Sequence, residues 1–477
     1  MKTKQDILEF IEENEQRFTH ISDQIWLKPE LSFQEFFSSK LQADFLEENG
    51  FHIQWDIAGM NTAFIAEWGS QKPIIAFAGE YDALPGLSQK VQDTIEPLVD
   101  GSPGHACGHN LLGVAHLAAA LAVKTWLKES GFSGTVRYYG CPAEEAGNGK
   151  TFMARAGLFD DLDAAFNFHP MFVNFASKGS VVALNDITFR FHGLSSHAGA
   201  APHMGRSALD AVELMNVGVN YLREHVPSDV RMHYVITNGG KAPNIVPHEA
   251  EVWYCLRARF PDTLREINGR VENIARGAAL MTGTSVEIIF NSGVSNLLNN
   301  KCLSDLQYDN MKIIGAINFT PEEIAFAEKI NAAYPENTFE ALSIGYCIPP
   351  EILRGKALVS DNFPAMDEGK CMSFSTDVGD LSWRTPLSLL MTACFPTNAS
   401  LHTWGATASA GMSIGHKGML HAAKIMALSA IDLFAEPERL IPIRNEFEDG
   451  LKAHPYQCPI PSGLQPPMYF NPVRSGI

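Results

Sequence analysis

Positive charge is scarce in this chain, and so are long apolar runs. Lysine and arginine total 36 against 54 aspartates and glutamates, which gives a formal net charge of −18. Because a negative field repels phosphate groups and anionic lipids, we expect neither nucleic acid nor a membrane as a partner. No stretch has the roughly 18 consecutive apolar residues of a membrane-spanning helix, and the charged segment 1–13 lacks the apolar core of a secretory signal. We therefore expect a cytoplasmic protein.

Paired cysteines and repeats are also missing. The eight cysteines are scattered without a Cys-x-x-Cys motif, so we expect free thiols in a reducing compartment. No internal repeat or low-complexity tract is present, which argues against a disordered protein. The 477 residues, of which 45% are hydrophobic, suffice for two or three domains with a sizeable core.

Apolar runs and helical patterns alternate in the first part of the chain. We expect short strands at 74–78, 135–139 and 164–168, and helices at 110–127 and 150–158. This alternation predicts an α/β fold with a mixed, largely parallel sheet flanked by helices. In such sheets, ligands collect beyond the carboxyl ends of the strands.

Residues 183–296 follow a different order of elements, which reads as β-α-β-β-α-β. That order is typical of a ferredoxin-like α+β module. We therefore expect an inserted second domain at 183–296, between two parts of a first domain at 1–182 and 297–477. Within the last part, residues 299–364 predict a helical, loop-rich excursion from the first domain.

The unit Cys107-Gly108-His109 directly precedes the helix expected at 110–127. Thiolate sulfur and imidazole nitrogen are the preferred ligands of zinc, and the glycine permits a bend that aims both side chains at one point. The alternative interpretation is a loop with a buried free cysteine and a capping histidine.

Glu144 and Glu145 are adjacent carboxylates that follow the strand expected at 135–139. Neighbouring side chains diverge on a turn, so one can bind a metal ion while the other serves as general acid and base. Nearby negative charge raises the proton affinity of that second carboxylate. The alternative is a solvated acidic turn.

Three further candidates are ambiguous when taken singly. His169 ends an expected strand, where a histidine is more often a hydrogen-bonded core residue than a ligand. Asp82 follows another strand and could orient a ligating histidine through its second ring nitrogen. A loop aspartate that accepts backbone hydrogen bonds is the alternative. His402 lies far downstream, and its local pattern does not separate it from His416 or His421.

The expected inserted domain offers groups that suit an anionic substrate. His197 lies in a Ser-Ser-His-Ala-Gly loop, Asn244 follows a Gly-Gly pair, and Arg257 lies on an expected strand. An asparagine amide and an arginine fork can bind a substrate carboxylate. The alternatives are a helix-capping loop, a tight turn and a surface ion pair.

Reactive residues at four separate strand ends together favour a catalytic site over a purely structural sheet.

These motifs together resemble the aminoacylase/carboxypeptidase family of dinuclear metallopeptidases, in particular its amidohydrolase branch. The resemblance runs through nearly the whole chain and implies a zinc-exopeptidase-like first domain with an inserted lid and dimerisation domain. The segments that carry it are 79–85, 104–110, 141–145, 207–211, 375–380 and 415–421. The chain departs from much of the branch at Asn110, where an aspartate is usual, and residues 297–364 are only loosely similar.

The resemblance implies a ligand set for two divalent metal ions per subunit, zinc or manganese. It also selects His402 over His416, which the local pattern left open. The residues that match the family's metal ligands are Cys107, His109, Glu145, His169 and His402.

The resemblance implies a role for the other candidates as well. Glu144 matches the general base, and Asp82 matches the carboxylate that orients a metal ligand. His197 matches a histidine that stabilises the oxyanion in the active site of the partner subunit. Asn244 and Arg257 match residues that hold the carboxylate of the substrate.

The activity implied by the resemblance is hydrolysis of the amide bond of a small anionic N-acyl amino acid, such as p-aminobenzoyl-glutamate. A metal-activated water would attack, in a homodimer or in a heterodimer with a related subunit. Three alternatives stay open: a dipeptidase or aminoacylase of the same family, a cysteine hydrolase that uses Cys107, and a non-catalytic subunit of a hetero-oligomeric hydrolase.

Overall fold

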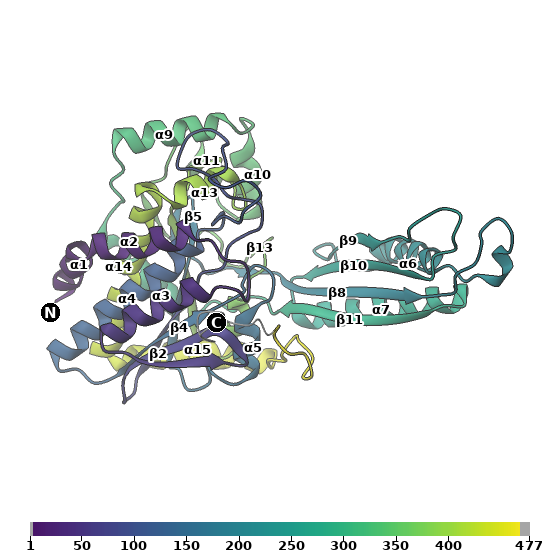
Figure 1. Cartoon of the computed structure of the whole chain (residues 1–477). Coiled ribbons are helices and arrows are strands. Elements are labelled where there is room, and N and C mark those ends of the chain that lie inside the picture. Colours follow the sequence, from purple (N-terminus) through teal and green to yellow (C-terminus); the bar gives the residue numbers. More distant parts are fainter. Residues whose placement is uncertain (1–2, 468–477) are drawn as a thin grey trace, which may run out of the picture.

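The apolar runs of the sequence form the strands of one eight-stranded sheet, the centre of a large α/β body (Figure 1). The computed structural model describes residues 3–467 of the chain. In order across the sheet, the strands are β1 (His52–Ile57), β2 (Met60–Gly69), β4 (Thr135–Cys141), β3 (Ile74–Glu80), β5 (Ala164–Met171), β14 (Leu387–Ala393), β6 (Asn174–Ala176) and β12 (Asn362–Phe363).

The direction of these strands decides where their ends meet. The neighbours β4, β3, β5 and β14 run parallel, whereas β1, β2 and β6 run antiparallel to their inner neighbours. The expected mixed, largely parallel sheet is therefore confirmed. A separate two-stranded pairing joins β7 (Ser180–Val181) to β13 (Cys371–Met372). Because the central strands point the same way, their carboxyl ends lie along one edge of the sheet.

Helices cover both faces of this sheet. They are α1 (Lys4–Glu13), α2 (Glu15–Leu27), α3 (Phe36–Glu48), α4 (His109–Ser130), α5 (Gly149–Arg155), α8 (Lys301–Ile314), α9 (Pro321–Ala332), α10 (Thr338–Gly345), α11 (Pro350–Leu353), α12 (Val378–Ser382), α13 (Trp404–Ala410), α14 (Ser413–Ala435), the 3₁₀ turn η3 (Pro437–Arg439) and α15 (Leu440–Ala453). On one face, α4 and α14 pack on the strands with α1, α2, α3 and α8 around them. Residues of α5 and α12 belong to the core on the other face.

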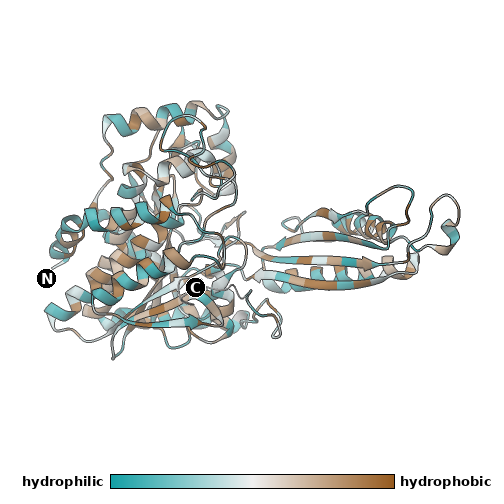
Figure 2. Ribbon diagram, viewed as in Figure 1, coloured by the Kyte–Doolittle hydropathy of each residue, from teal (hydrophilic) through white to brown (hydrophobic). Residues whose placement is uncertain are grey.

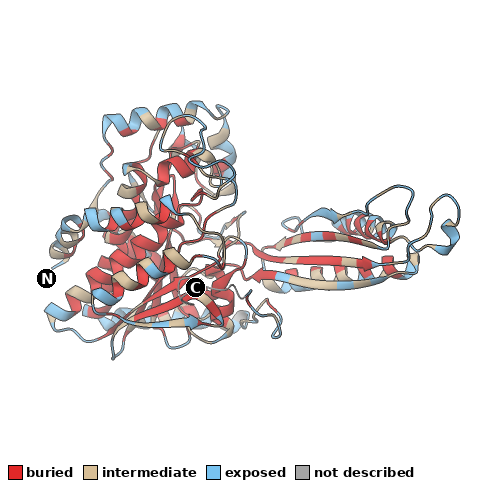
Figure 3. Ribbon diagram, in the orientation of Figure 1, coloured by how far each residue is buried: buried red, intermediate tan, exposed pale blue. Residues whose placement is uncertain are grey.

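The helices α4 and α14 are the longest described helices of this body, and apolar residues make up most of each (Figure 2). By length and composition alone, both could cross a membrane, so the expectation that no stretch of the chain would qualify is wrong on that measure. The fold buries 89% and 83% of their apolar windows, which is the usual position of core helices. Figure 3 shows the same concentration of buried residues in the sheet and in α4.

The arm that projects from this body in Figure 1 has a sheet and a core of its own. Its elements are β8 (Ala183–His192), η1 (Pro202–Met204), α6 (Ala208–Leu222), η2 (Arg223–His225), β9 (Arg231–Asn238), β10 (Glu249–Ala258), α7 (Pro261–Thr282) and β11 (Ser285–Val294). The strand order is β11-β8-β10-β9 with every pair antiparallel, and this is the expected ferredoxin-like arrangement. The domain limits at 183 and 296 stay a prediction.

Candidate metal centre

The polar clusters of the sequence meet at the carboxyl edge of the parallel strands. β3 ends at Glu80, β4 is followed by Glu144 and Glu145, His169 lies on β5, and His109 begins α4. Because β4, β3 and β5 are adjacent and parallel, residues that are tens of positions apart in the sequence come together there.

Gly108 shapes the loop that leads into α4. Its φ is +77°, in the left-handed region, and a Cβ at this position would lie 2.9 Å from the ring of Phe395 and 3.1 Å from Pro170. Glycine satisfies both conditions, because it lacks a Cβ and tolerates a positive φ. The turn brings the ligand atoms of Cys107 and His109 to within 4.8 Å of each other.

Two groups of donor atoms share the thiol of Cys107. Ligand atoms of Cys107, His109 and His169 lie within 4.8 Å of one another, with 3.4 Å between Cys107 Sγ and His169 Nε2. Cys107, Glu145 and His402 meet the same limit, with 3.4 Å between His402 Nε2 and Glu145 Oε2. Two groups joined by one thiol suit a pair of cations, since thiolate, imidazole and carboxylate are ligands of zinc and manganese.

Asp82 fixes the ring of His109. His109 Nδ1 donates to Asp82 Oδ1 at 2.9 Å, which leaves Nε2 to face the donor groups. Asp82 itself accepts hydrogen bonds from Ser32 Oγ at 2.8 Å and from Glu145 N at 2.9 Å. Within residues 3–467, the buried atoms His109 Nε2 and Glu145 Oε1 have no hydrogen-bond partner. Such atoms are rare in folded proteins, and these two fit ligation of a cation.

Glu144 lies next to this cluster, in a third group with Glu80 and His109 whose ligand atoms are also within 4.8 Å. Burial and the charges of Glu80 and Glu145 raise the pKa of Glu144 well above its usual value. Burial also raises the pKa of Glu145, to about 7. A carboxyl group whose pKa is raised in this way can accept a proton and return it at neutral pH.

Lys150 forms a buried ion network with two carboxylates at the same edge of the sheet. Its Nζ lies 2.7 Å from Glu80 Oε1 and 2.5 Å from Asp377 Oδ1, and Glu80 Oε2 lies 3.2 Å from His109 Nε2. Burial raises the pKa of Glu80, but Lys150 and then His109 outweigh this and keep the pKa below its usual value. The sequence reasoning missed this network. Two features of the sequence could have indicated the network: Lys150 stands at the start of an apolar helical pattern, and Asp377 lies in the segment 375–380.

A cavity of about 590 Å³ opens on the donor groups. Arg257, Asp186 and Trp253 of the arm line it together with Tyr346 and Phe374 of the body. The Nε of Arg257 is buried and, in the described part of the chain, has no hydrogen-bond partner. A half-buried arginine whose Nε has no partner suits a carboxylate. That is the role predicted for Arg257, and it stays a prediction.

His197 and Asn244 do not join this cavity. β8 passes the cavity at Asp186 and ends at His192, about 20 Å further along the strand. The loop beyond His192 carries His197, which is exposed and pairs with Ile245, while Ala198 N donates to Asn244 O at 3.0 Å. Both predicted residues therefore lie together at the far end of the arm, out of reach of the donor groups in their own chain.

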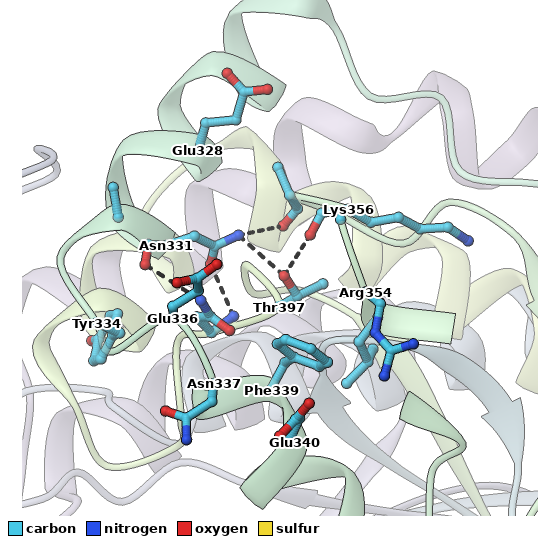
Figure 4. A pocket seen from close by; sticks show the side chains of 15 residues that line it. Glu328, Asn331, Tyr334, Glu336, Asn337, Phe339, Glu340, Arg354, Lys356 and Thr397 are labelled. Carbon is cyan, nitrogen blue, oxygen red and sulfur yellow. Dashed lines mark hydrogen bonds between the residues drawn. The ribbon is translucent and has the colours of Figure 1, made fainter. Parts of the chain in front are cut away.

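His402 lies on a loop that the excursion holds in place. Its φ is +62°, which is disfavoured for a residue other than glycine, and its N–H donates to Ala106 O at 2.9 Å. Asn331 Nδ2 donates to Thr397 Oγ1 at 3.1 Å, and Asn398 N donates to Asn331 Oδ1 at 2.9 Å. These residues line a second cavity, of about 970 Å³, which shares no lining residue with the cavity at the donor groups (Figure 4).

His416 and His421, which the local sequence pattern did not separate from His402, have different partners. His416 Nε2 lies 2.9 Å from Asp23 Oδ1, and His421 Nε2 lies 2.9 Å from Asn362 Oδ1. Neither residue belongs to the donor groups found among residues 3–467.

Known proteins match this chain over most of its length. The family model for Peptidase family M20/M25/M40 matches residues 76–213, and that for the peptidase dimerisation domain matches residues 183–280. The chain is 44% identical over 469 residues to one subunit of the p-aminobenzoyl-glutamate hydrolase of Escherichia coli (strain K12), covering 96% of this chain and 97% of that protein. The chain belongs to the M20/M25/M40 peptidase family.

Other members of this family are more distant. Xaa-Arg dipeptidase of Mus musculus is 31% identical over 462 residues, covering 94% of this chain and 93% of that protein. A dinuclear metal-binding M20 peptidase from Bacillus subtilis has a TM-score of 0.57 at 18% identity, covering 89% of this chain and 99% of that one. An aminobenzoyl-glutamate utilization protein from Klebsiella pneumoniae has a TM-score of 0.58 at 17% identity, covering 89% and 97%.

Family membership confirms two predictions from the sequence motifs. The chain is a hydrolase of amide bonds in a metal-dependent family, and its fold is that of the solved M20 peptidases with an added dimerisation domain. The donor groups at the sheet edge agree with a metal cofactor. The identity of the metal and the role of each residue stay predictions.

Proposed function

We propose that this M20 family member hydrolyses the amide bond of an N-acyl amino acid, with p-aminobenzoyl-glutamate as a substrate. One observation carries the proposal: four of the five metal-type donors line one cavity together with Glu144 and Arg257. The fifth donor, His109, is buried behind this lining, with its ligand atom within 4.8 Å of those of Cys107 and His169. The 44% identical Escherichia coli protein, which belongs to a p-aminobenzoyl-glutamate hydrolase, supports the choice of substrate. A cytoplasmic location remains part of the proposal.

The donor set fits two divalent cations, and its chemistry allows zinc or manganese. The thiol favours zinc, while carboxylate and imidazole donors also suit manganese. When bound, such cations lower the pKa of a water molecule and polarise the carbonyl of the amide. The residues that would hold them are Cys107, His109, Glu145, His169 and His402.

The remaining chemistry belongs to side chains of this protein. Glu144 accepts the proton of the attacking water and then donates it to the leaving amine. Asp82 keeps His109 in the tautomer that has Nε2 free. Arg257 binds the carboxylate of the amino acid, which fixes the amide beside Glu144. An acidic protein can thereby accept an acidic substrate.

A second protomer would complete the site. His197 and Asn244 lie at the far end of the arm, so they can act only on the cavity of another protomer. The edge strand β9 exposes Tyr234, Val235 and Ile236, and an exposed apolar edge strand is a surface for pairing. The partner is a second copy of this chain or a related protein. The Escherichia coli hydrolase has a further type of subunit, which is 29% identical to this chain over 266 residues.

The proposed function is tested by metal analysis combined with one substitution. The purified protein should contain two divalent ions per chain, lose hydrolysis of p-aminobenzoyl-glutamate on chelation, and regain it with zinc or manganese. Glu144→Gln should keep the metal and lose most turnover, because it removes the proton acceptor and leaves the five donors. Glu438→Gln, on the exposed turn η3, is the matched control. Near-normal turnover by Glu144→Gln, or full activity without metal, would refute the proposal.

A second candidate function is a dipeptidase for substrates with a basic residue. Asp186 lines the same cavity as Arg257 and offers an anionic partner for a cationic group. The 31% identical mouse relative is an Xaa-Arg dipeptidase. A panel of N-acyl glutamates and Xaa-Arg dipeptides separates the two functions. If the dipeptides are preferred, Asp186→Asn should abolish that preference.

A further inference from the structure

The excursion that the sequence left without a role reaches the cavity at the donor groups. Its helix α10 ends at Gly345, and the next residue, Tyr346, lines the cavity together with Phe374. Both rings come from segments outside the catalytic motifs. The proposed chemistry at Glu144 uses neither of them.

The two rings form a continuous aromatic wall that starts at a candidate metal ligand. The ring centroids of His169 and Phe374 are 6.4 Å apart, and those of Phe374 and Tyr346 are 5.5 Å apart at an interplanar angle of 42°. Phe172 packs edge-on against Tyr346 at 5.5 Å and 83°. Each pair has the spacing of favourable aromatic contacts, so the wall is supported from behind.

Backbone contacts hold this wall in position before any substrate binds. Ser373 N donates to Gly345 O at 3.1 Å, which ties the segment of Phe374 to the end of α10. Tyr346 N donates to Leu342 O at 2.9 Å and so closes the last turn of the helix. A subsite that is already formed loses little conformational entropy when a rigid ligand binds.

The cavity therefore offers two different kinds of surface. Arg257, with its buried and unpartnered Nε, suits the carboxylate of the amino acid, and the aromatic wall suits an apolar planar group. An N-acyl amino acid has one group of each kind, on either side of the amide. If the carboxylate binds Arg257, the acyl group is left for the wall.

We infer that Tyr346 and Phe374 form the acyl subsite and select substrates with a planar aromatic acyl group. This inference rests on the proposed function and deepens it, because it identifies the class of acyl group and the excursion residue that recognises it. Loss of one ring contact should reduce specificity for an aromatic acyl group by roughly two- to tenfold.

The test compares two substrates that share the leaving group, p-aminobenzoyl-glutamate and N-acetyl-glutamate. Tyr346→Ala in the metal-loaded, full-length protein should lower kcat/KM for the aromatic substrate by roughly two- to tenfold and change that for the acetyl substrate by less than about twofold. Tyr346→Phe keeps the ring and should keep the preference. Ile344→Ala, two residues away on α10 with its side chain 82% exposed, is the matched control. Metal content is measured for every variant.

The outcomes separate the inference from the proposed function. An unchanged ratio of the two kcat/KM values in both Tyr346→Ala and Phe374→Leu overturns the inference and leaves the function intact. If the wild-type protein hydrolyses neither substrate, the proposed function fails. The wall is then judged by calorimetric binding of p-aminobenzoate, which Tyr346→Ala should weaken. Equal affinity of the wild type and Tyr346→Ala for p-aminobenzoate overturns the inference by that route as well.

Discussion

Tyr334→Phe removes a single oxygen atom from the support of the loop that carries His402. The hydroxyl of Tyr334 lies 2.8 Å from Thr403 Oγ1 and accepts a hydrogen bond from Gly405 N at 3.2 Å. The ring of Tyr334 stacks on Trp404 at 5.9 Å and 8°, and phenylalanine keeps this contact. The substitution therefore removes two hydrogen bonds and little packing, directly beside a residue with a φ of +62°.

The expected effect follows from these two bonds. Each contributes about 0.5–1.5 kcal/mol net, so the loop loses about 1–3 kcal/mol of support. The left-handed conformation of His402 costs about 1–2 kcal/mol, so a loop with less support can relax away from the ligating geometry. If the whole loss falls on that geometry, the affinity for one metal ion drops roughly five- to 150-fold. This interval includes the roughly ten- to hundredfold losses seen when groups that orient metal ligands are changed.

The assay is a titration of bound metal against a competing chelator, with the metal counted per chain. We expect Tyr334→Phe to release one of its two ions at a lower chelator concentration than the wild type and to retain the other. Tyr308→Phe, a surface tyrosine of α8 whose ring contacts Lys312, is the matched control. If Tyr334→Phe has a lower Tm but the same two metal affinities as the wild type, the hydroxyl serves only general stability and the reasoning is refuted.

Three further predictions concern the buried charges and the arm. Lys150→Met removes the ammonium group that two buried carboxylates share and should lower the free energy of unfolding in urea by about 3–5 kcal/mol. A variant as stable as the wild type would contradict this. Burial raises the pKa of Glu35 to about 8, above the unfolded value, so its contribution to stability is complete below about pH 4.5 and is lost as the pH rises toward 8. Glu35→Gln should gain stability relative to the wild type between pH 5 and 8 and level off above that, whereas a constant difference would contradict this. Mixing inactive His197→Ala with inactive Glu144→Gln should restore part of the activity if protomers share sites, and no recovery would argue for separate sites.

The sequence alone was sufficient to predict the elements whose apolar residues follow one clear periodicity. The run at 74–78 is β3 and the helical pattern at 110–127 lies within α4, because both are buried core elements with nearly continuous apolar faces. The hairpin of β1 and β2 was not predicted. β1 lies at the edge of the sheet and is half exposed along its length, so its pattern is mixed and carries little signal.

The candidate donors could be named from the sequence because each belongs to a short motif with characteristic chemistry. The pairing of Lys150 with Asp377 could not be predicted, since 227 positions separate the two residues and neither has a marked local pattern. The position of Tyr346 could not be predicted either, since Tyr346 reaches the cavity because the end of α10 is hydrogen-bonded to Ser373. Contacts of this kind depend on the path of the chain between the two residues, which local periodicity does not encode.

The sequence by itself therefore determined the chemistry that is available: thiol, imidazole and carboxyl donors at the ends of predicted strands. Only the tertiary structure decided which donors share one space, and that His197 lies far from the donor groups of its own chain. The physical reason is that side-chain periodicity sets which face of an element is buried. The order and direction of the strands, by contrast, set which of their ends meet.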